Sequence, residues 1–276
     1  MGIEAIILII LAGFVCELID ASMGMMYGTI LSPVLIIIGF DPLLVVPSIL
    51  ISQAIGGFIA SVFHQRFKNV DFELKTKNPR IIMRKLAELG YIETFRKETT
   101  KDLRVVFCII VFGVIATVIA ALVAVNIPKI VLKTYIGALV IVMGTTLLLR
   151  INFRFSWRKI TIIGILSAFN KGVSGGGFGP VVTSGQIIAG RNGKSSIGAT
   201  TLAEAPICFI GFLTYLIARG IPNWQLPIFL SLGAITAAPL GALLTSKFKS
   251  EKKLRLGMGI LVVILGIWIL IKTWII

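Results

Sequence analysis

Long apolar segments separated by short polar ones make up most of the chain. The apolar segments cover residues 3–39, 43–64, 105–126, 130–149, 158–190, 195–218, 224–246 and 255–275. A helix needs about 20 mostly apolar residues to cross a bilayer, and most of these segments reach that length. The pattern predicts an all-α polytopic membrane protein.

Two of the apolar segments are broken near their middle. The first is interrupted at Asp20-Ala-Ser-Met-Gly, and the second at Asn170-Lys-Gly-Val-Ser-Gly-Gly-Gly-Phe-Gly. Each glycine costs a helix about 1 kcal/mol relative to alanine, so such a cluster ends it. Unwound backbone at membrane depth persists only where it is buried in protein or lines a watery cavity. Half-helices that meet at such breaks are typical of transporter binding sites.

The two halves of the chain are similar at a shift of 151 residues. The shift aligns Gly24, Tyr27 and Gly28 with Gly175, Phe178 and Gly179, Gln53 with Glu204, Lys68 with Arg219, and Asp20 with Lys171. Each half then consists of one broken element followed by three apolar segments. We therefore predict two repeats, residues 1–150, which include a polar loop at 66–104, and residues 151–276.

The basic residues predict how the repeats cross the membrane. Residues 1–65 contain no lysine or arginine, whereas 22 of the 27 basic residues lie in 66–104, 150–159, 191–194 and 247–255. All four clusters fall on the cytoplasmic side only if each broken element is a re-entrant hairpin of half-helices about ten to fifteen residues long. The repeats are then inverted, and both termini lie outside the cytoplasm of a multi-pass cell-membrane protein. Within the loop, apolar residues at helical spacing predict an amphipathic helix over 79–91, on the membrane surface or against the bundle.

Three short sequences resemble the sulfite exporter TauE/SafE family. They are Ala21-Ser-Met-Gly-Met-Met-Tyr-Gly with Pro33 downstream, Val173-Ser-Gly-Gly-Gly-Phe-Gly-Pro, and Lys68-Asn-Val-Asp-Phe. The resemblance covers nearly the whole chain and implies a bacterial or archaeal inner-membrane permease for small sulfur-containing anions, such as sulfite, thiosulfate or organosulfonates. The first copy departs from the family pattern, because Met23-Gly-Met-Met stands where a run of glycines is usual. That departure leaves the substrate open.

The breaks contain the candidate substrate-binding residues. These are Ser22, Met23, Gly24, Tyr27, Gln53, Asn170, Lys171, Ser174, Gly175, Gly176 and Gly177. Free N–H groups at the half-helix that begins near Phe178 favour an anion, although glycines also allow helices simply to cross closely. Lys171 is either a counter-charge for the substrate or the partner of Asp20 in a structural ion pair. The two serines either donate to sulfonate oxygens or satisfy nearby backbone.

Carboxylates within apolar segments are candidates for proton coupling. Glu204 lies in the middle of its segment before Pro206, with Glu17 and Asp20 as further candidates. A carboxylate at membrane depth is costly and usually functional. The alternative is that Glu204 is permanently bonded to the neighbouring broken helix.

The remaining chemistry argues against an enzyme. There is no catalytic constellation, no phosphate-binding glycine loop and no metal-ligand spacing around the single histidine, His64, which we expect at the cytoplasmic interface. Cys16, Cys108 and Cys208 are expected to be ordinary buried residues. The N-terminus shows no signal-peptide pattern, and no cofactor is expected.

The expected partners are a small anion and the lipid bilayer, with a homodimer left open and no nucleic acid despite the net charge of +15. We therefore expect a secondary transporter that exports small sulfur anions. An anion channel, an uptake permease and a membrane scaffold that docks a soluble partner are the alternatives.

Overall fold

The computed structural model is helical through most of the residues it describes, which are 2–76, 78–148, 157–188, 191–247 and 252–275. The helices are α1 (Ile3–Met23), α2 (Tyr27–Ile37), α3 (Pro42–Arg66), α4 (Pro79–Glu98), α5 (Lys101–Asn126), α6 (Lys129–Leu148), α7 (Trp157–Ser174), α8 (Phe178–Ile188), α9 (Gly193–Arg219), α10 (Gln225–Lys247) and α11 (Lys252–Trp274). The described part of the chain contains no strand, and one isolated bridge pairs Leu74 with Thr99. The predicted all-α class is therefore confirmed.

Side-chain caps fix where several helices begin. Asp41 Oδ1 accepts a hydrogen bond from the N–H of Leu43 at the start of α3, and Pro42 occupies the first helical position. Asn192 Oδ1 caps α9 in the same way through the N–H of Lys194. Such caps satisfy N–H groups that the helix itself leaves unpaired. The apolar segments therefore become helices with boundaries within a few residues of those expected.

Five of the described helices are long and apolar enough to cross a membrane, namely α1, α3, α5, α9 and α10. Large apolar side chains such as Phe107, Ile217 and Trp268 are exposed on the outside of the bundle. An exposed apolar surface of this kind suits a lipid environment. The chain is thus a multi-pass helical membrane protein.

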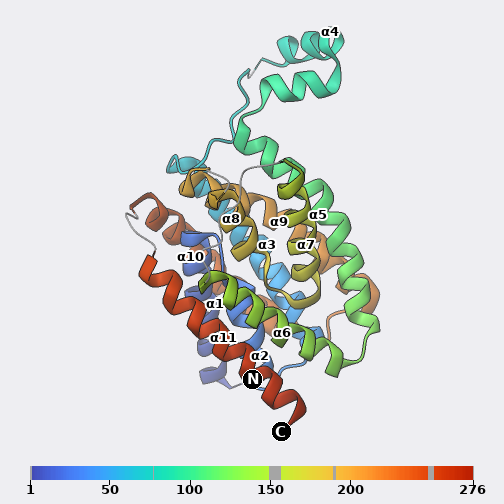
Figure 1. Cartoon of the computed structure of the whole chain (residues 1–276), viewed down its shortest axis with the longest axis vertical. Coiled ribbons are helices and arrows are strands. Elements are labelled where there is room, and N and C mark those ends of the chain that lie inside the picture. The colour runs from blue at the N-terminus through green and yellow to red at the C-terminus, as the bar shows by residue number, and fades with distance from the viewer. Residues whose placement is uncertain (1, 77, 149–156, 189–190, 248–251, 276) are drawn as a thin grey trace.

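Two central helices organise the packing. α3 packs against α9, and each also contacts one outer helix, α10 for α3 and α5 for α9. α1 packs on α10, α7 packs on α5, and α6 packs on α11 (Figure 1). The broken elements also contact this central pair, mainly through α2 on α3 and α8 on α9.

The broken elements form hairpins that open toward opposite ends of the bundle. Lys272, near the end of α11, donates to the carbonyl of Ile37, the last residue of α2, at the end where both termini lie. Arg191, just after α8, pairs with Asp102 at the start of α5, next to α4. We call these the terminal end and the α4 end (Figure 1). The second arms have 11 residues each, as expected, but the first arms are longer than expected, with 21 residues in α1 and 18 in α7.

The polar loop holds a helix close to the predicted one, followed by a second helix. α4 spans Pro79–Glu98, but Gly90 is not helical, with a φ of 75°, so α4 comprises two helices joined at a kink there. It stands apart from the helix bundle in Figure 1, so packing against the bundle was wrong for most of it. The ring of Phe95 does reach Phe107 of α5, with centroids 5.0 Å apart.

Several basic residues of the topology argument, among them Arg150, Arg154 and Lys249, lie outside the described residues.

Candidate functional site

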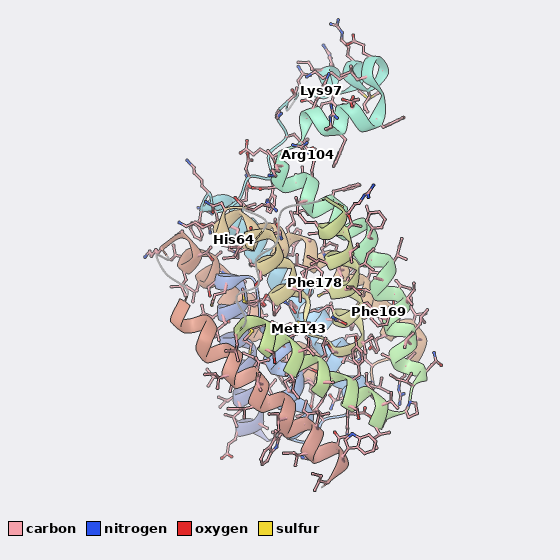
Figure 2. All side chains as sticks on the ribbon, in the orientation of Figure 1. His64, Lys97, Arg104, Met143, Phe169 and Phe178 are labelled. Carbon is pink, nitrogen blue, oxygen red and sulfur yellow. The ribbon has the colours of Figure 1, made fainter. Side chains whose placement is uncertain are left out.

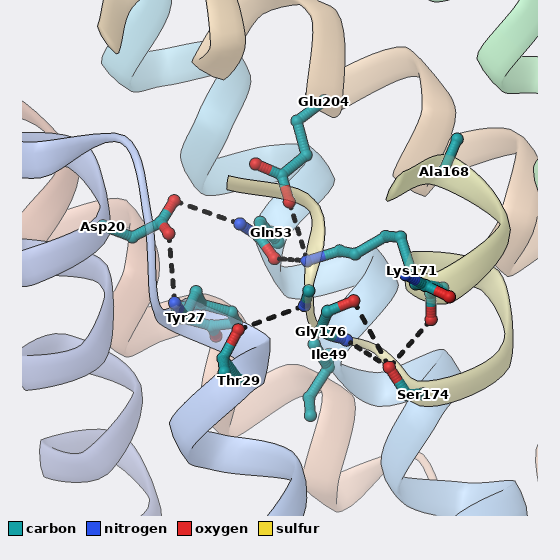
Figure 3. A network of polar contacts seen from close by, with 12 residues as sticks. Asp20, Tyr27, Thr29, Ile49, Gln53, Ala168, Lys171, Ser174, Gly176 and Glu204 are labelled. Atoms are coloured by element: carbon teal, nitrogen blue, oxygen red, sulfur yellow. Dashed lines mark hydrogen bonds and ion pairs between the residues drawn. The ribbon is translucent and has the colours of Figure 1, made fainter. Parts of the chain in front are cut away.

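The two glycine-rich breaks meet in the centre of the bundle. A β-carbon added at Gly28 would lie 1.6 Å from the carbonyl oxygen of Gly175, and one added at Gly179 would lie 2.5 Å from the carbonyl oxygen of Gly24. Both distances are far too short for any side chain. The N–H of Gly177 donates to Thr29 Oγ1 at 3.1 Å across the same contact (Figure 3). The break of each hairpin is therefore in direct contact with the first turn of the other hairpin's second arm.

The two breaks also share their backbone conformation. φ is 69° at Gly24 and 75° at Gly175, and it is 106° at Met26 and 81° at Gly177. These are the positions that the shift of 151 residues aligns. Glycine adopts positive φ without cost, but Met26 does not, and such strained residues cluster at functional sites.

A fully buried polar network surrounds this contact (Figure 3). Lys171 Nζ lies 2.8 Å from Glu204 Oε1, and the two side chains are 1% and 4% exposed. Lys171 Nζ also donates to Gln53 Oε1, and Gln53 Nε2 donates to Asp20 Oδ2 at 3.0 Å. The network joins α1 and α3 of the first half to α7 and α9 of the second half.

The partner of Lys171 differs from one of the two expected alternatives. The direct ion pair is formed with Glu204, whereas Asp20 is reached only through Gln53. Instead, Asp20 Oδ1 accepts a hydrogen bond from the N–H of Tyr27 at 3.0 Å and so caps the first turn of α2. A carboxylate at a helix N-terminus is stabilised by the free N–H groups and by the helix dipole. At α8 the aligned position holds Lys171, so that N-terminus lacks the matching carboxylate.

Glu17 is a second buried carboxylate on α1. It is fully buried, and neither of its carboxylate oxygens has a hydrogen-bond partner among the described residues. A β-carbon on Gly56 of α3 would approach the Glu17 carboxyl carbon to 2.9 Å. Glu17 is close enough to interact electrostatically with Asp20, Glu204 and Lys171. Three carboxylates thus face one ammonium group in this part of the core, and buried charge of one sign is costly unless it is neutralised.

The two candidate serines at the breaks form hydrogen bonds with nearby backbone groups in this structure. Ser22 Oγ donates to the carbonyl of Ile19 on its own helix at 2.9 Å. Ser174 Oγ donates to the carbonyl of Asn170 at 2.8 Å and accepts from the N–H of Gly176 at 3.1 Å. These contacts favour the backbone-satisfying alternative for both serines in this conformation. Met23 is fully buried beside them.

Several polar residues of the site, namely Ser52, Tyr135 and Tyr215, were not singled out from the sequence. The hydroxyl of Tyr27 donates to Ser52 Oγ at 2.8 Å, and the hydroxyl of Tyr215 donates to the carbonyl of Gly172 at 2.8 Å. The hydroxyl of Tyr135 donates to Asn170 Oδ1 at 2.5 Å. These residues could have been noticed in the sequence, because each is a tyrosine or serine within an otherwise apolar segment.

His64 is buried within the protein at the end of α3. It is 0% exposed, and its Nδ1 lies 3.0 Å from Asn69 Nδ2, which can only donate. Its Nε2 therefore carries the proton and donates to the carbonyl of Ala21 at 2.9 Å. The side chain ties the end of α3 to the end of α1.

This combination of broken helices, a buried ion pair and an apolar exterior defines a helical membrane transporter. Residues 87–269 match the family model described as "Sulfite exporter TauE/SafE", and the chain belongs to that family, as its sequence resemblance predicted. It is also 27% identical, over 283 residues, to the "Probable membrane transporter protein YtnM" of Bacillus subtilis (strain 168). That alignment covers 95% of this chain and 82% of the relative. No solved structure shows significant similarity to the chain.

Proposed function

We propose that the protein is a secondary transporter that exports small sulfur-containing anions, such as sulfite or organosulfonates, bound near the membrane midplane between the two breaks. The observation that carries the proposal is the contact of the two glycine breaks beside the buried Lys171. A desolvated ammonium group and the N-terminus of α8 both favour an oxyanion.

The proposed architecture is a pair of inverted-topology repeats, residues 1–150 and 151–276, with both termini outside the cell and the α4 end in the cytoplasm. The packing partners support it, because α1 on α10 corresponds to α7 on α5, and α10 on α3 corresponds to α5 on α9. The paired positive φ values at the two breaks support it too. α3 with α9, and α6 with α11, then lie on the pseudo-twofold axis.

The proposed binding step is a competition for Lys171. An arriving oxyanion takes the place of Glu204 or Gln53 beside the ammonium group, while the N-terminus of α8 supplies backbone N–H donors. The remaining candidate residues at the breaks, Ser174 and Gly175–Gly177 among them, shape the same pocket. Asp20 already occupies the N-terminus of α2, which leaves the α8 side for the substrate.

The proposed energy source is a proton gradient. When substrate displaces Glu204 from Lys171, a buried carboxylate is left without its cation, and taking up a proton removes the cost of that charge. Glu17, which has no hydrogen-bond partner among the described residues, and Asp20 are the other carboxylates able to take part. Rocking of the two repeats about the site would then release the proton and the anion on opposite sides.

The test is flux of sulfite, thiosulfate, sulfoacetate and chloride through purified protein in proteoliposomes. We expect sulfur oxyanions to be preferred, with flux that responds to an imposed pH gradient. Lys171→Ala should abolish the preference, while Lys129→Ala, which removes an exposed lysine paired with Asp41, should not. Chloride flux at channel rates, or equal flux with Lys171→Ala, would contradict the proposal and favour the channel. A protein without any flux would favour the scaffold.

A further inference from the structure

The core also contains polar side chains between the breaks and the α4 end that the site does not use. They lie on the facing sides of α8 and α9, are each at most 1% exposed, and comprise Thr183, Gln186, Ser196 and Thr200. We call this set the polar seam. Polar groups buried within a bilayer are costly, and where they occur they often line a substrate path.

Hydrogen bonds join the polar seam to the surface ion pair at the α4 end. Arg191 donates one N–H to Asp102 Oδ1 and another to Gln186 Oε1. Gln186 Nε2 then donates to Thr200 Oγ1 at 2.9 Å. Arg191 is 8% exposed, so its charge is nearly buried at the outer limit of the seam.

The inner limit of the polar seam reaches the first glycine break. Thr183 Oγ1 donates to the carbonyl of Gly24 at 2.6 Å and lies 3.0 Å from Thr200 Oγ1. On α9, positions 196, 200 and 204 are spaced four residues apart and therefore share one helix face. Glu204 of the buried ion pair is the next residue on that face, so the polar seam leads directly to the site.

The corresponding route toward the terminal end is mostly apolar, with the buried Ser32, at the position aligned with Thr183, as its polar residue. The residues 151 positions earlier than Ser196 and Thr200 are Val45 and Ile49, both fully buried. Gln186 corresponds to Leu35 and Arg191 to Phe40. The polar seam is therefore a property of one side of the site and does not follow from the internal repeat.

We propose that the polar seam is the half-pathway by which a small oxyanion moves between the central site and the α4 end, and that the Arg191–Asp102 pair closes it. When the pair separates, Arg191 binds the oxyanion, because a guanidinium group offers two parallel N–H donors to a carboxylate or to a similar oxyanion. The Asp102 carboxylate occupies that place in the closed form. The inference rests on the proposed transport function and adds to it a route for the anion and the residue, Arg191, that binds the anion at the α4 end.

The experiment measures access to the polar seam without requiring transport. Thr183→Cys is treated in membrane vesicles with an impermeant, negatively charged methanethiosulfonate, and modification is read from the mass of the peptide containing residue 183. A second reporter, Met83→Cys on the exposed α4, identifies the vesicles whose α4 end faces the reagent. We expect slow modification from the α4 end, accelerated about tenfold by Asp102→Asn, because a charge-assisted bond to the closing arginine is weakened. Asp41→Asn, which breaks an exposed ion pair at the start of α3, should leave the rate unchanged.

Two further variants keep the result decisive. Arg191→Gln breaks the same ion pair from its other side, so it should also open the seam, yet it should remove the preference for the negative reagent over a positive one. Ser32→Cys, the aligned position on the apolar side, should stay unmodified in the Asp102→Asn background. Equal labelling at residues 32 and 183, no acceleration in either ion-pair variant, or acceleration by Asp41→Asn would overturn the proposal. If labelling follows the expectation but sulfite does not cross, the route stands and the proposed substrate fails.

Discussion

Removing Lys171 should destabilise the fold far more than removing its partner Glu204. Lys171→Met deletes the ammonium group and leaves Glu204, Asp20 and Glu17 as carboxylates without a cation beside them. Breaking a buried pair in this way costs roughly 3–5 kcal/mol. Glu204→Gln leaves Lys171 bonded to Gln53 with two carboxylates still in range, so we expect about 1–2 kcal/mol.

The double variant separates pairing from burial. Lys171→Met with Glu204→Gln removes both charges of the pair, and replacing a buried pair by neutral groups of similar volume is often nearly neutral. We expect a loss of roughly 1–2 kcal/mol relative to the parent protein, which implies a coupling energy of roughly 3–5 kcal/mol between the two positions. At about 2 °C per kcal/mol for a chain of this size, Lys171→Met should lower Tm by about 6–10 °C.

The assay is thermal unfolding in detergent, followed by the fluorescence of the four tryptophans. The control is Lys129→Met, because Lys129 and Asp41 form an ion pair with side chains 54% and 36% exposed, and such pairs contribute about 1 kcal/mol or less. Burial alone would raise the pKa of Asp41, but hydrogen bonds from Lys129 and from the N–H of Leu43 hold that pKa below its usual value. The control pair is therefore intact at neutral pH and weakens only as Asp41 becomes protonated in acid. A Tm of Lys171→Met within about 1 °C of the parent, or a double variant as unstable as the sum of the singles, would refute the reasoning.

Three other outcomes are expected. Gly176→Val should abolish transport, because a β-carbon there would lie 2.8 Å from the backbone nitrogen of Thr29 in the first turn of α2, whereas Gly57→Ala, with its nearest neighbour at 3.5 Å, should transport normally; flux in proteoliposomes decides. Glu204→Gln should keep substrate exchange but lose its response to a pH gradient, and a wild-type pH profile would make Glu204 structural. A cysteine at Lys194 should react only with reagent on the cytoplasmic side and one at Ile275 only from outside, and the reverse labelling would contradict the inverted topology.

The sequence predicted the helices well because the length of an apolar segment is a strong physical constraint in a membrane. The segments expected at 43–64 and 224–246 became Pro42–Arg66 and Gln225–Lys247. The breaks were equally readable, because clustered glycines cannot hold a helix. The length of the first arms could not be read from the sequence, because Asp20 remains helical in α1 and the helix ends only at Gly24. A polar residue does not end a helix when its own side chain finds a buried hydrogen-bond partner, as Asp20 does.

The pairing within the site could not be predicted from sequence spacing. Whether Lys171 meets Asp20 or Glu204 depends on the rotation of four helices about their axes, which no linear pattern specifies. The burial of His64 depends likewise on Asn69, which folds back over it after α3 has ended. The helix expected over 79–91 corresponds to the first part of α4, and the second part, which follows the kink at Gly90 and ends at Glu98, was not predicted.

The buried ion pair also sets an order of events during synthesis. Lys171 leaves the ribosome 33 residues before Glu204, so α7 enters the membrane carrying a charge whose partner has not yet been made. A lysine without a partner in an inserting helix is costly. Gln53 and Asp20 are already in place by then, and they offer the ammonium group temporary partners until α9 follows. We therefore expect the second hairpin to settle late, against the first half of the chain.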